Sequence, residues 1–199
     1  MAGIRAIRSV CESVVGILQT VYTASPPTGL PATPAFAVYL ASDFKDASHM
    51  QEGVSLFLYR VYVNTSQRAA QQRDIATGKI SLPSLPLELH FFLTIWAKTA
   101  SVQHDILGWT MRTLEDYSIL PAPLLNQVDG AAFRVDETVE IIAGQLTNEE
   151  LMRIWDDLHT DYQLSIPYVA RVVRIESQRE IGEGAAVLLR EFDAGVPKA

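Results

Sequence analysis

The amino-acid sequence predicts an α+β fold in which helices pack on a single, mostly antiparallel or mixed β-sheet. In several segments apolar residues recur at steps of three and four, which is typical of amphipathic helices. Other runs are rich in β-branched and aromatic residues, which favour strands. These elements follow the order α-β-β-β-α-β-α-β. Strands that succeed one another without a helical crossover favour antiparallel pairing.

Length and composition indicate one domain. We expect it to span residues 1–177 of the 199, followed by a tail of residues 178–199. The 48% hydrophobic content is sufficient for one packed core. The net charge of −7 predicts no nucleic-acid partner, because binding to phosphates needs a basic face. No apolar stretch reaches the roughly 18 residues that can span a bilayer, so we expect no direct membrane insertion.

The N-terminal region predicts a helix, a connector and a strand. Apolar residues at helical spacing place the helix over Ile4–Thr23. The prolines of Ser25–Pro34 remove amide donors and predict an extended connector. Ala35–Ala41 is expected to be a strand, and the polar segment Asp43–Gly53 a turn.

Two strands are expected on either side of a long polar segment. Val54–Asn64 is apolar on both faces, which predicts a central strand. In Leu87–Ala97, alternate residues starting at Leu89 would line one face of a second strand. Thr65–Leu82, between them, predicts a loop that either contacts a partner or is a tolerated surface insertion. Its candidate contact residues are Gln67, Arg68, Gln71, Gln72, Arg73 and Lys79.

The C-terminal half predicts helices alternating with strands. Ser101 is the expected N-cap of a helix that runs to about Tyr117 and has a broad apolar side. Val135–Ile142 alternates apolar and acidic residues, as a half-exposed strand does. Thr147 and Glu150 match a capping box at the start of another helix. The apolar side of the first helix would comprise Ile106, Leu107, Trp109, Met111 and Leu114.

The last predicted strand is Leu164–Ile175. It contains Pro167, which cannot donate to a ladder, so we expect this strand at an edge or bulged at the proline. Residues after Ser177 predict a weakly helical tail.

The sequence shows no recognisable reaction centre, and we therefore expect neither an enzyme nor a cofactor or metal site. The histidines have no metal-ligand spacing, and neighbouring helical residues such as His104 and Asp105 point about 100° apart. Serine-nucleophile and phosphate-binding glycine motifs are missing. The only cysteine, Cys11, cannot form an intramolecular disulfide, which agrees with a reducing compartment.

Four motifs in a fixed order carry a family resemblance. They are S-L-F-L-Y-R-V in Val54–Asn64, L-P-L-x-L-H-F-F-L-T-x-W-A in Pro83–Ala97, H-x-x-L-G-W-x-M-R-x-L in His104–Leu114 and S-I-P-Y-V-A-R-V-V-R-I in Ser165–Ile175. With them the chain resembles the N-terminal domain family of cap proteins from extracellular contractile injection systems, which are phage-tail-like particles of the antifeeding-prophage type. The motif and structural residues are Tyr59, Arg60, His90, Trp96, Leu107, Gly108, Trp109, Arg112, Trp155 and Tyr168.

The resemblance implies a structural role and a fold like that of phage tail terminators. Such a protein would form a ring, expected to be a hexamer, on the distal end of the inner tube, and would contact tube and sheath proteins. It would be made in the cytoplasm and then join a particle that can be released. Two alternatives stay open: a tail-completion protein of a related bacteriophage, and a small-molecule-binding α+β domain. The three tryptophans are expected in the core.

Overall fold

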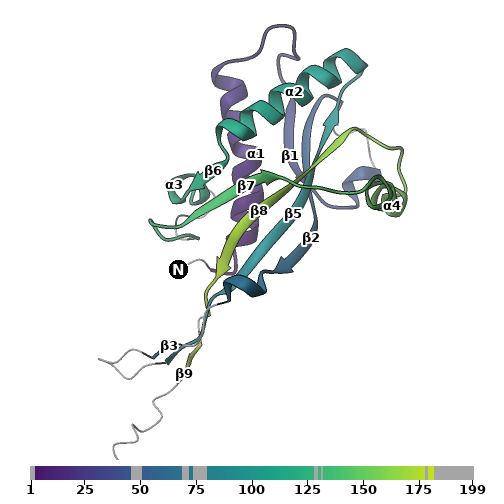
Figure 1. The fold of residues 1–199 in the computed structure, drawn as a ribbon. Coiled ribbons are helices and arrows are strands. Elements are labelled where there is room, and N and C mark those ends of the chain that lie inside the picture. The colour runs from purple at the N-terminus through teal and green to yellow at the C-terminus, as the bar shows by residue number, and fades with distance from the viewer. Residues whose placement is uncertain are drawn as a thin grey trace, which may run out of the picture.

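A six-stranded mixed sheet forms the centre of the molecule (Figure 1). The computed structural model of the chain describes residues 3–45, 51–68, 72–73, 80–127, 130, 132–177 and 179–181. The first strand pairs in parallel with its neighbour, and the other pairings are antiparallel. In spatial order the strands are β1 (Ala35–Tyr39), β2 (Gly53–Val63), β5 (Leu85–Trp96), β8 (Ser165–Ile175), β7 (Thr138–Ala143) and β6 (Ile119–Pro121). The predicted α+β class is confirmed.

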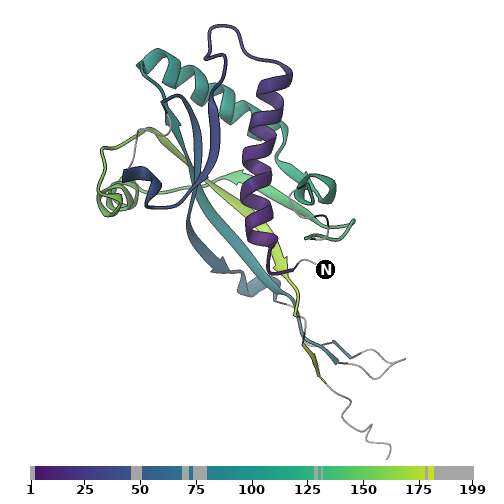
Figure 2. The ribbon, with the colours of Figure 1, turned by 180° about the vertical axis from the view of Figure 1, so that it is seen from behind.

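One face of the sheet is covered by α1 (Ala6–Ala24), α2 (Ala100–Asp116) and α3 (Ala122–Leu125). Figure 2 shows α1 lying across this face. Its apolar stripe packs against alternate side chains of β5, as the period-two pattern of that strand predicts. The fully buried members of β5 on this side are Leu89, Phe91, Leu93 and Ile95.

In the part of the chain that the structure describes, the opposite face is covered at one end only, by α4 (Asn148–Leu158) and the short 3-10 helix η1 (Asp43–Lys45). Phe44 of η1 is fully buried, and its ring meets that of Trp155 edge-on at a centroid distance of 5.5 Å. Trp96 completes the cluster and donates a hydrogen bond from Nε1 to Ser55 Oγ at 2.8 Å. The sequence predicted only a polar turn around Phe44, so this second core was missed. The capping box of α4 is confirmed at Thr147.

The segment predicted as a polar loop contains regular structure. Thr65–Gln67 forms the 3-10 helix η2, and two short strands, β3 (Gln72–Arg73) and β4 (Ile80–Ser81), pair with each other. β4 also pairs with β9 (Glu180–Ile181), so the expectation of a helical tail is wrong at these residues. The small sheet lies beyond the ends of β5 and β8 in Figure 1.

The structure corrects two expectations about α2. Thr99 is its N-cap in place of Ser101, because the Thr99 hydroxyl accepts from the Val102 amide at 3.4 Å. Met111 is 43% exposed, while Thr110 is buried on the side that packs on the sheet.

The position of β8 also differs from the prediction, because this strand lies in the interior of the sheet, between β5 and β7. Pro167 is tolerated there because its backbone faces the end of β7. The N–H and C=O of a strand residue point to the same side, so the N–H that proline lacks would also have pointed beyond the paired part of β7. The carbonyl accepts from Gly144 N at 2.8 Å, just beyond the β7 ladder. The sequence also missed β6 and α3, which follow α2 directly.

Candidate functional site

On the α4 side, one half of the sheet has no helix packed on it among the described residues. β1 pairs with β2 only as far as Phe57, so Leu58–Val63 has no neighbouring strand on its outer edge among the described residues. α4 and η1 pack over the other half, where the aromatic cluster lies. The C-terminal half of β2 and the N-terminal half of β5 therefore present side chains to solvent. We call this part of the sheet the open face and define it by Arg60, Tyr62, Asn64, Glu88 and His90.

A bulge in β2 sets which residues reach the open face. Leu58 pairs with Phe91 and Arg60 with His90, so Tyr59 is an extra residue in the strand. Without it, strict alternation would turn Arg60 towards the α1 side. The bulge instead places the polar residues of β2 on the α4 side. The ring of Tyr59 stays partly buried against Phe92, with centroids 5.8 Å apart.

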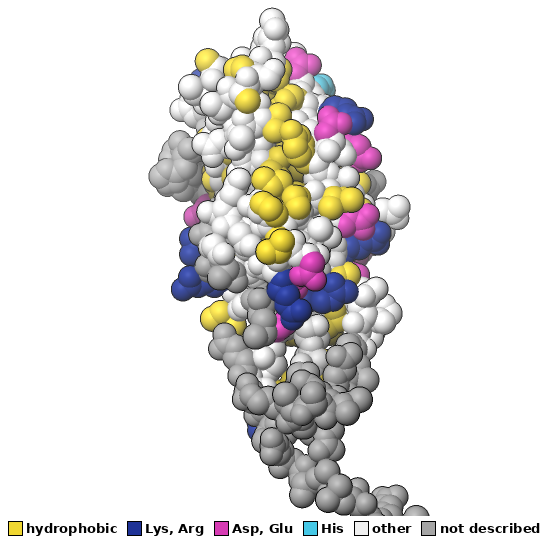
Figure 3. All heavy atoms as spheres, turned by 90° about the vertical axis from the view of Figure 1, so that its left-hand side faces the viewer, with side chains coloured by type: hydrophobic (Ala, Val, Ile, Leu, Met, Phe, Trp, Pro, Cys, Tyr) yellow, Lys and Arg dark blue, Asp and Glu magenta, His cyan; other side chains and the backbone are white. Residues whose placement is uncertain are grey.

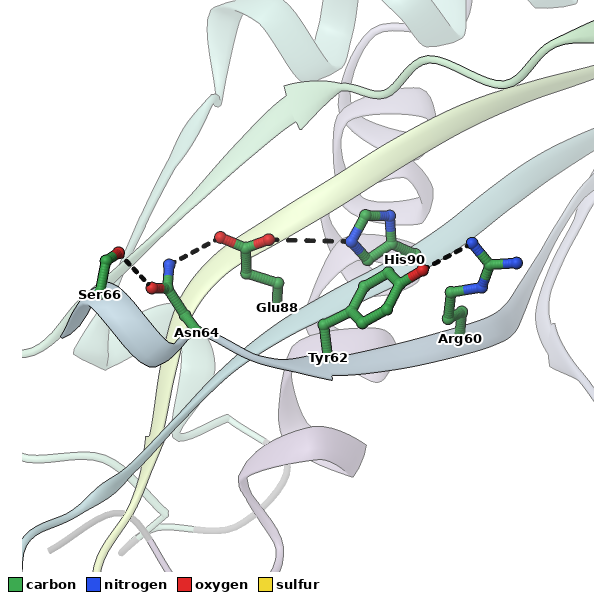
Figure 4. Close-up of polar contacts among 6 residues, drawn as sticks. All are labelled: Arg60, Tyr62, Asn64, Ser66, Glu88 and His90. Atoms are coloured by element: carbon green, nitrogen blue, oxygen red, sulfur yellow. Dashed lines mark hydrogen bonds and ion pairs between the residues drawn. The ribbon is translucent and has the colours of Figure 1, made fainter. Parts of the chain in front are cut away.

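Arg60, Tyr62 and His90 form the aromatic part of the open face (Figure 4). The Arg60 guanidinium donates from Nη1 to the Tyr62 hydroxyl at 2.8 Å and lies 5.4 Å from the centre of the Tyr62 ring. The His90 ring meets the Tyr62 ring edge-on, with centroids 5.0 Å apart. These contacts hold three side chains of two strands in fixed positions while Tyr62 remains 47% exposed.

Glu88 and Asn64 continue the same row of side chains. Asn64 Nδ2 donates to Glu88 Oε1 at 2.8 Å, and Asn64 Oδ1 accepts from Ser66 Oγ at 2.6 Å (Figure 4). The following residue, Gln67, accepts a hydrogen bond from Arg174 Nη2 at 3.1 Å. Hydrogen bonds thus connect η2 to both β5 and β8.

His90 is held mainly in its neutral form. Partial burial lowers the pKa of its imidazole below the ordinary value of 6.5, while Glu88 acts in the opposite direction and Arg60 lowers the pKa further. The Glu88 Oε2 to His90 Nε2 distance of 3.9 Å is too long for a hydrogen bond, so this contact is an electrostatic attraction alone.

The charged row extends across β8 and β7. Arg171 lies directly opposite Glu140 in the ladder, and its Nε donates to the Glu140 carboxylate at 2.9 Å. Both residues lie on the α4 side, because their neighbours Ala170 and Ile141 pack in the α1-side core. Four strands therefore contribute charged or hydrogen-bonding groups to one surface.

The residues singled out from the sequence fall into three groups. Tyr59, Arg60 and His90 lie together at the open face. Of the contact-loop residues, Gln67 and the exposed Arg68 are next to it. Gln72 and Arg73 form β3, whereas Gln71 and Lys79 lie outside the described residues.

The remaining motif residues lie outside the open face. Trp96, Trp155 and Tyr168 are buried, and burial raises the pKa of Tyr168 to about 12. On α2, Leu107 and Trp109 are partly buried, and Trp109 meets the ring of Tyr22 edge-on at 5.0 Å. Gly108 is exposed, and Arg112 pairs with Asp116 on the surface of the same helix.

The described residues contain no group of three or more potential metal ligands. Cys11 is buried, and burial raises the pKa of its thiol to about 12, which disfavours the reactive thiolate. A depression of about 480 Å³ near the end of α4 is lined by Trp155, Asp156, His159, Thr160 and Asp161, apart from the open face. In the described part of the chain, no helix is long and apolar enough to cross a membrane.

Sequence reasoning missed the contributions of Asn64 and Glu88. The alternation Glu88, His90, Phe92 does place these three on one face of β5. What the sequence could not reveal is where α4 stops covering that face. The bulge at Tyr59 also hid the polar side of β2. It reverses the in-out alternation of side chains halfway along the strand, so a strict two-residue period makes both faces look apolar.

Two solved structures from contractile injection systems share this fold. The sheath/tube terminator of the PVC extracellular contractile injection system, in its extended state, aligns over 97% of this chain with a TM-score of 0.59. The tube-terminating cap of the anti-feeding prophage aligns over 92% with a TM-score of 0.55. Each is 16% identical, and this chain spans 64% and 59% of their respective lengths.

No curated protein matches the chain. The family model of the Pvc16 N-terminal domain matches residues 9–188, which is most of the sequence. The chain therefore belongs to the Pvc16 N-terminal domain family.

Proposed function

We propose that this chain is a structural cap protein that terminates the inner tube and sheath of a phage-tail-like contractile injection system. The observation that carries the proposal is the open face, a surface of ordered polar and aromatic side chains on a fold shared with tube terminators. The proposed role is assembly, with no substrate turned over.

The open face has the properties of a protein-binding surface. Arg and Tyr are enriched at interface hot spots, and Arg60 and Tyr62 lie together at its centre. Their mutual contacts fix their rotamers before a partner arrives, which reduces the entropy lost on binding. The side chains project from long strands, so the surface is held by the sheet and not by a loop.

We infer that η2 and the strands after it extend this contact surface. Gln67 and Arg68 lie next to the open face, and Gln71, Gln72, Arg73 and Lys79 follow in the sequence. The proposed assembly is a ring, taken to be hexameric, at the distal end of the tube, built from the domain of residues 1–177. In this proposal the protein is made in the cytoplasm and then becomes part of a particle that can be released.

The role is tested by deleting the gene from a strain that makes the particles. Loss of a terminator should leave tubes or sheaths of uncontrolled length, or sheaths that are unstable, as seen by electron microscopy. Particles of normal length and stability in the deletion strain would contradict the proposed function. Purified particles should also contain sheath, tube and baseplate proteins.

The binding surface is tested by Arg60→Ala combined with Tyr62→Ala in the complementing gene. We expect the double variant to fold but to cap fewer tubes, because it removes the centre of the open face. The matched control is Arg153→Ala, since Arg153 is 75% exposed on α4 and pairs only locally with Glu149. Equal capping by both variants would exclude the open face as the binding surface.

A further inference from the structure

Apolar side chains are exposed along both outer edges of the sheet. At one edge, β1 ends beside the middle of β2, and apolar residues continue from the end of β1 along the unpaired half of β2. We define this β2 edge surface by Val38, Leu40, Val61 and Val63, which are between 40% and 70% exposed. Among the described residues, Leu58–Val63 has no partner strand at this edge, so it presents backbone donors and acceptors there.

The opposite edge carries a second apolar surface. It lies around β6 and the end of α2, and we define this β6 edge surface by Met111, Tyr117, Ile119 and Val135. Their exposed fractions run from 43% for Met111 and Tyr117 to 93% for Val135. Figure 3 views this side of the molecule and shows apolar side chains gathered in a stripe, with charged side chains beside it.

The segments that bear the two surfaces are opposite in charge. Residues 111–119 and 134–140 around β6 hold Glu115, Asp116, Asp136, Glu137 and Glu140 against Arg112 and Arg134, and Arg171 of β8 pairs with Glu140. Residues 38–45 and 58–68, which bear the β2 edge surface, hold Lys45, Arg60 and Arg68 against a single acidic residue, Asp43. Each edge would repel a copy of itself, whereas the two different edges attract each other.

We propose that the β2 edge surface of one copy of this chain docks on the β6 edge surface of the next copy. The occupant is a second copy because the surfaces are complementary in charge, are both apolar and lie on opposite edges of one sheet. Such a contact is heterologous, and repeated copies close into a ring when the rotation between them closes. The inference rests on the proposed function, since it identifies the contact that builds the proposed ring.

The test uses the full chain and two variants, Val61→Glu and Ile119→Glu. The wild type should form oligomers larger than a dimer in mass photometry, and each variant alone should be monomeric. A mixture of the two variants should give 1:1 dimers, because one intact β2 edge surface then meets one intact β6 edge surface. Met152→Glu is the matched control: Met152 is 44% exposed on α4 and belongs to neither edge surface, so this variant should assemble like the wild type.

Folding of each variant is checked by its melting temperature. Val61→Thr and Ile119→Thr keep the β-branched shape, so they weaken assembly without endangering the strands. A single variant that still forms dimers, or a mixture that stays monomeric, would overturn the edge contact. If the wild type caps tubes and the two Glu variants still assemble, the edge contact is wrong but the proposed function stands. Oligomers in solution combined with normal particles in the deletion strain would contradict the function alone.

Discussion

Trp155 packs on the sheet side of α4 through ring contacts, without a side-chain hydrogen bond in the described structure. It is 2% exposed and meets the rings of Phe44, Phe92 and Tyr162. Trp155→Ala should lower the free energy of unfolding by about 3–5 kcal/mol, because it leaves a cavity between α4 and β5. Urea unfolding measures the loss, and a value below about 1 kcal/mol would show that the ring is not part of the core.

Trp155→Phe and Met152→Ala are the controls for that substitution. The indole Nε1 of Trp155 has no hydrogen-bond partner in the described structure, so Trp155→Phe should cost much less than the alanine variant. Met152 lies on the exposed side of the same helix, and its truncation should change stability little.

His90 provides a test of the electrostatics of the open face. Its pKa is lowered mainly by burial, so the folded protein binds this proton less readily than the unfolded chain does. The stability that His90 contributes is therefore present above about pH 6.5 and is lost as the pH falls through the folded pKa. Titration of the His90 ring by nuclear magnetic resonance should show a midpoint below 6.5.

Two variants fix the sign of each neighbour. Glu88→Gln should lower the pKa of His90 further, because the carboxylate favours the protonated ring. Arg60→Met should raise it, since a nearby cation is removed. Shifts in the opposite directions would mean that the row of Figure 4 is arranged differently in solution.

At the scale of elements, alanine substitutions at two glycines should change stability in opposite directions. Gly53 begins β2 with φ of +149°, and a Cβ built there would lie 2.0 Å from the carbonyl oxygen of Ala35. Gly53→Ala should therefore be strongly destabilising, because the clash is with backbone of the paired strand β1. Gly108, within α2, has no atom within 4 Å of such a Cβ, so Gly108→Ala should stabilise by up to about 1 kcal/mol.

Thermal unfolding of the two glycine variants checks this pair. If Gly53→Ala melted like the wild type, the close approach of β1 to β2 would be wrong. If Gly108→Ala were more stable but capped tubes less well, a partner would have to approach α2 closely at that glycine.

The elements themselves were predictable where local signals agree with the fold. The capping box at Thr147 and the alternation in β5 are sufficient to place α4 and the central strand. The predictions failed where the fold overrode the local signal. Pro167 lies in an interior strand because its missing donor faces a ladder end, and Phe44 is buried because η1 folds back over β5. Neither fact depends on residues close in sequence.

For the molecule as a whole, both cores are built on the same strand. β5 contributes Phe91 to the α1-side cluster and Phe92 to the aromatic cluster. Unfolding of β5 would therefore remove packing partners from both clusters at once. We expect one cooperative unfolding transition, with tryptophan fluorescence and far-ultraviolet circular dichroism giving the same midpoint. Separate midpoints for the two signals would mean that the α4 side unfolds independently.

The general class of the molecule could be predicted from its sequence, whereas its surfaces could not. Amphipathic periods and strand composition establish the α+β class, and four ordered motifs indicate the family. The open face depends on where coverage by α4 ends and where β1 stops pairing at Phe57, which are properties of the assembled sheet. The apolar edge at Ile119 was also missed, because it belongs to β6, a three-residue strand that the sequence did not predict.

The extra residue in β2 also determines which changes of chain length the protein can tolerate. Removing one residue from a strand normally reverses the facing of everything after it. Removing Tyr59 would instead erase the bulge and leave Arg60 opposite His90, so the outward residues keep their side and only one packed ring is lost. A one-residue insertion has no existing bulge to remove, so it would reverse the facing of the residues that follow it. Natural length variation in this strand should therefore favour loss at position 59 over gain. Melting curves of the deletion variant and of a matched insertion would show whether that asymmetry exists.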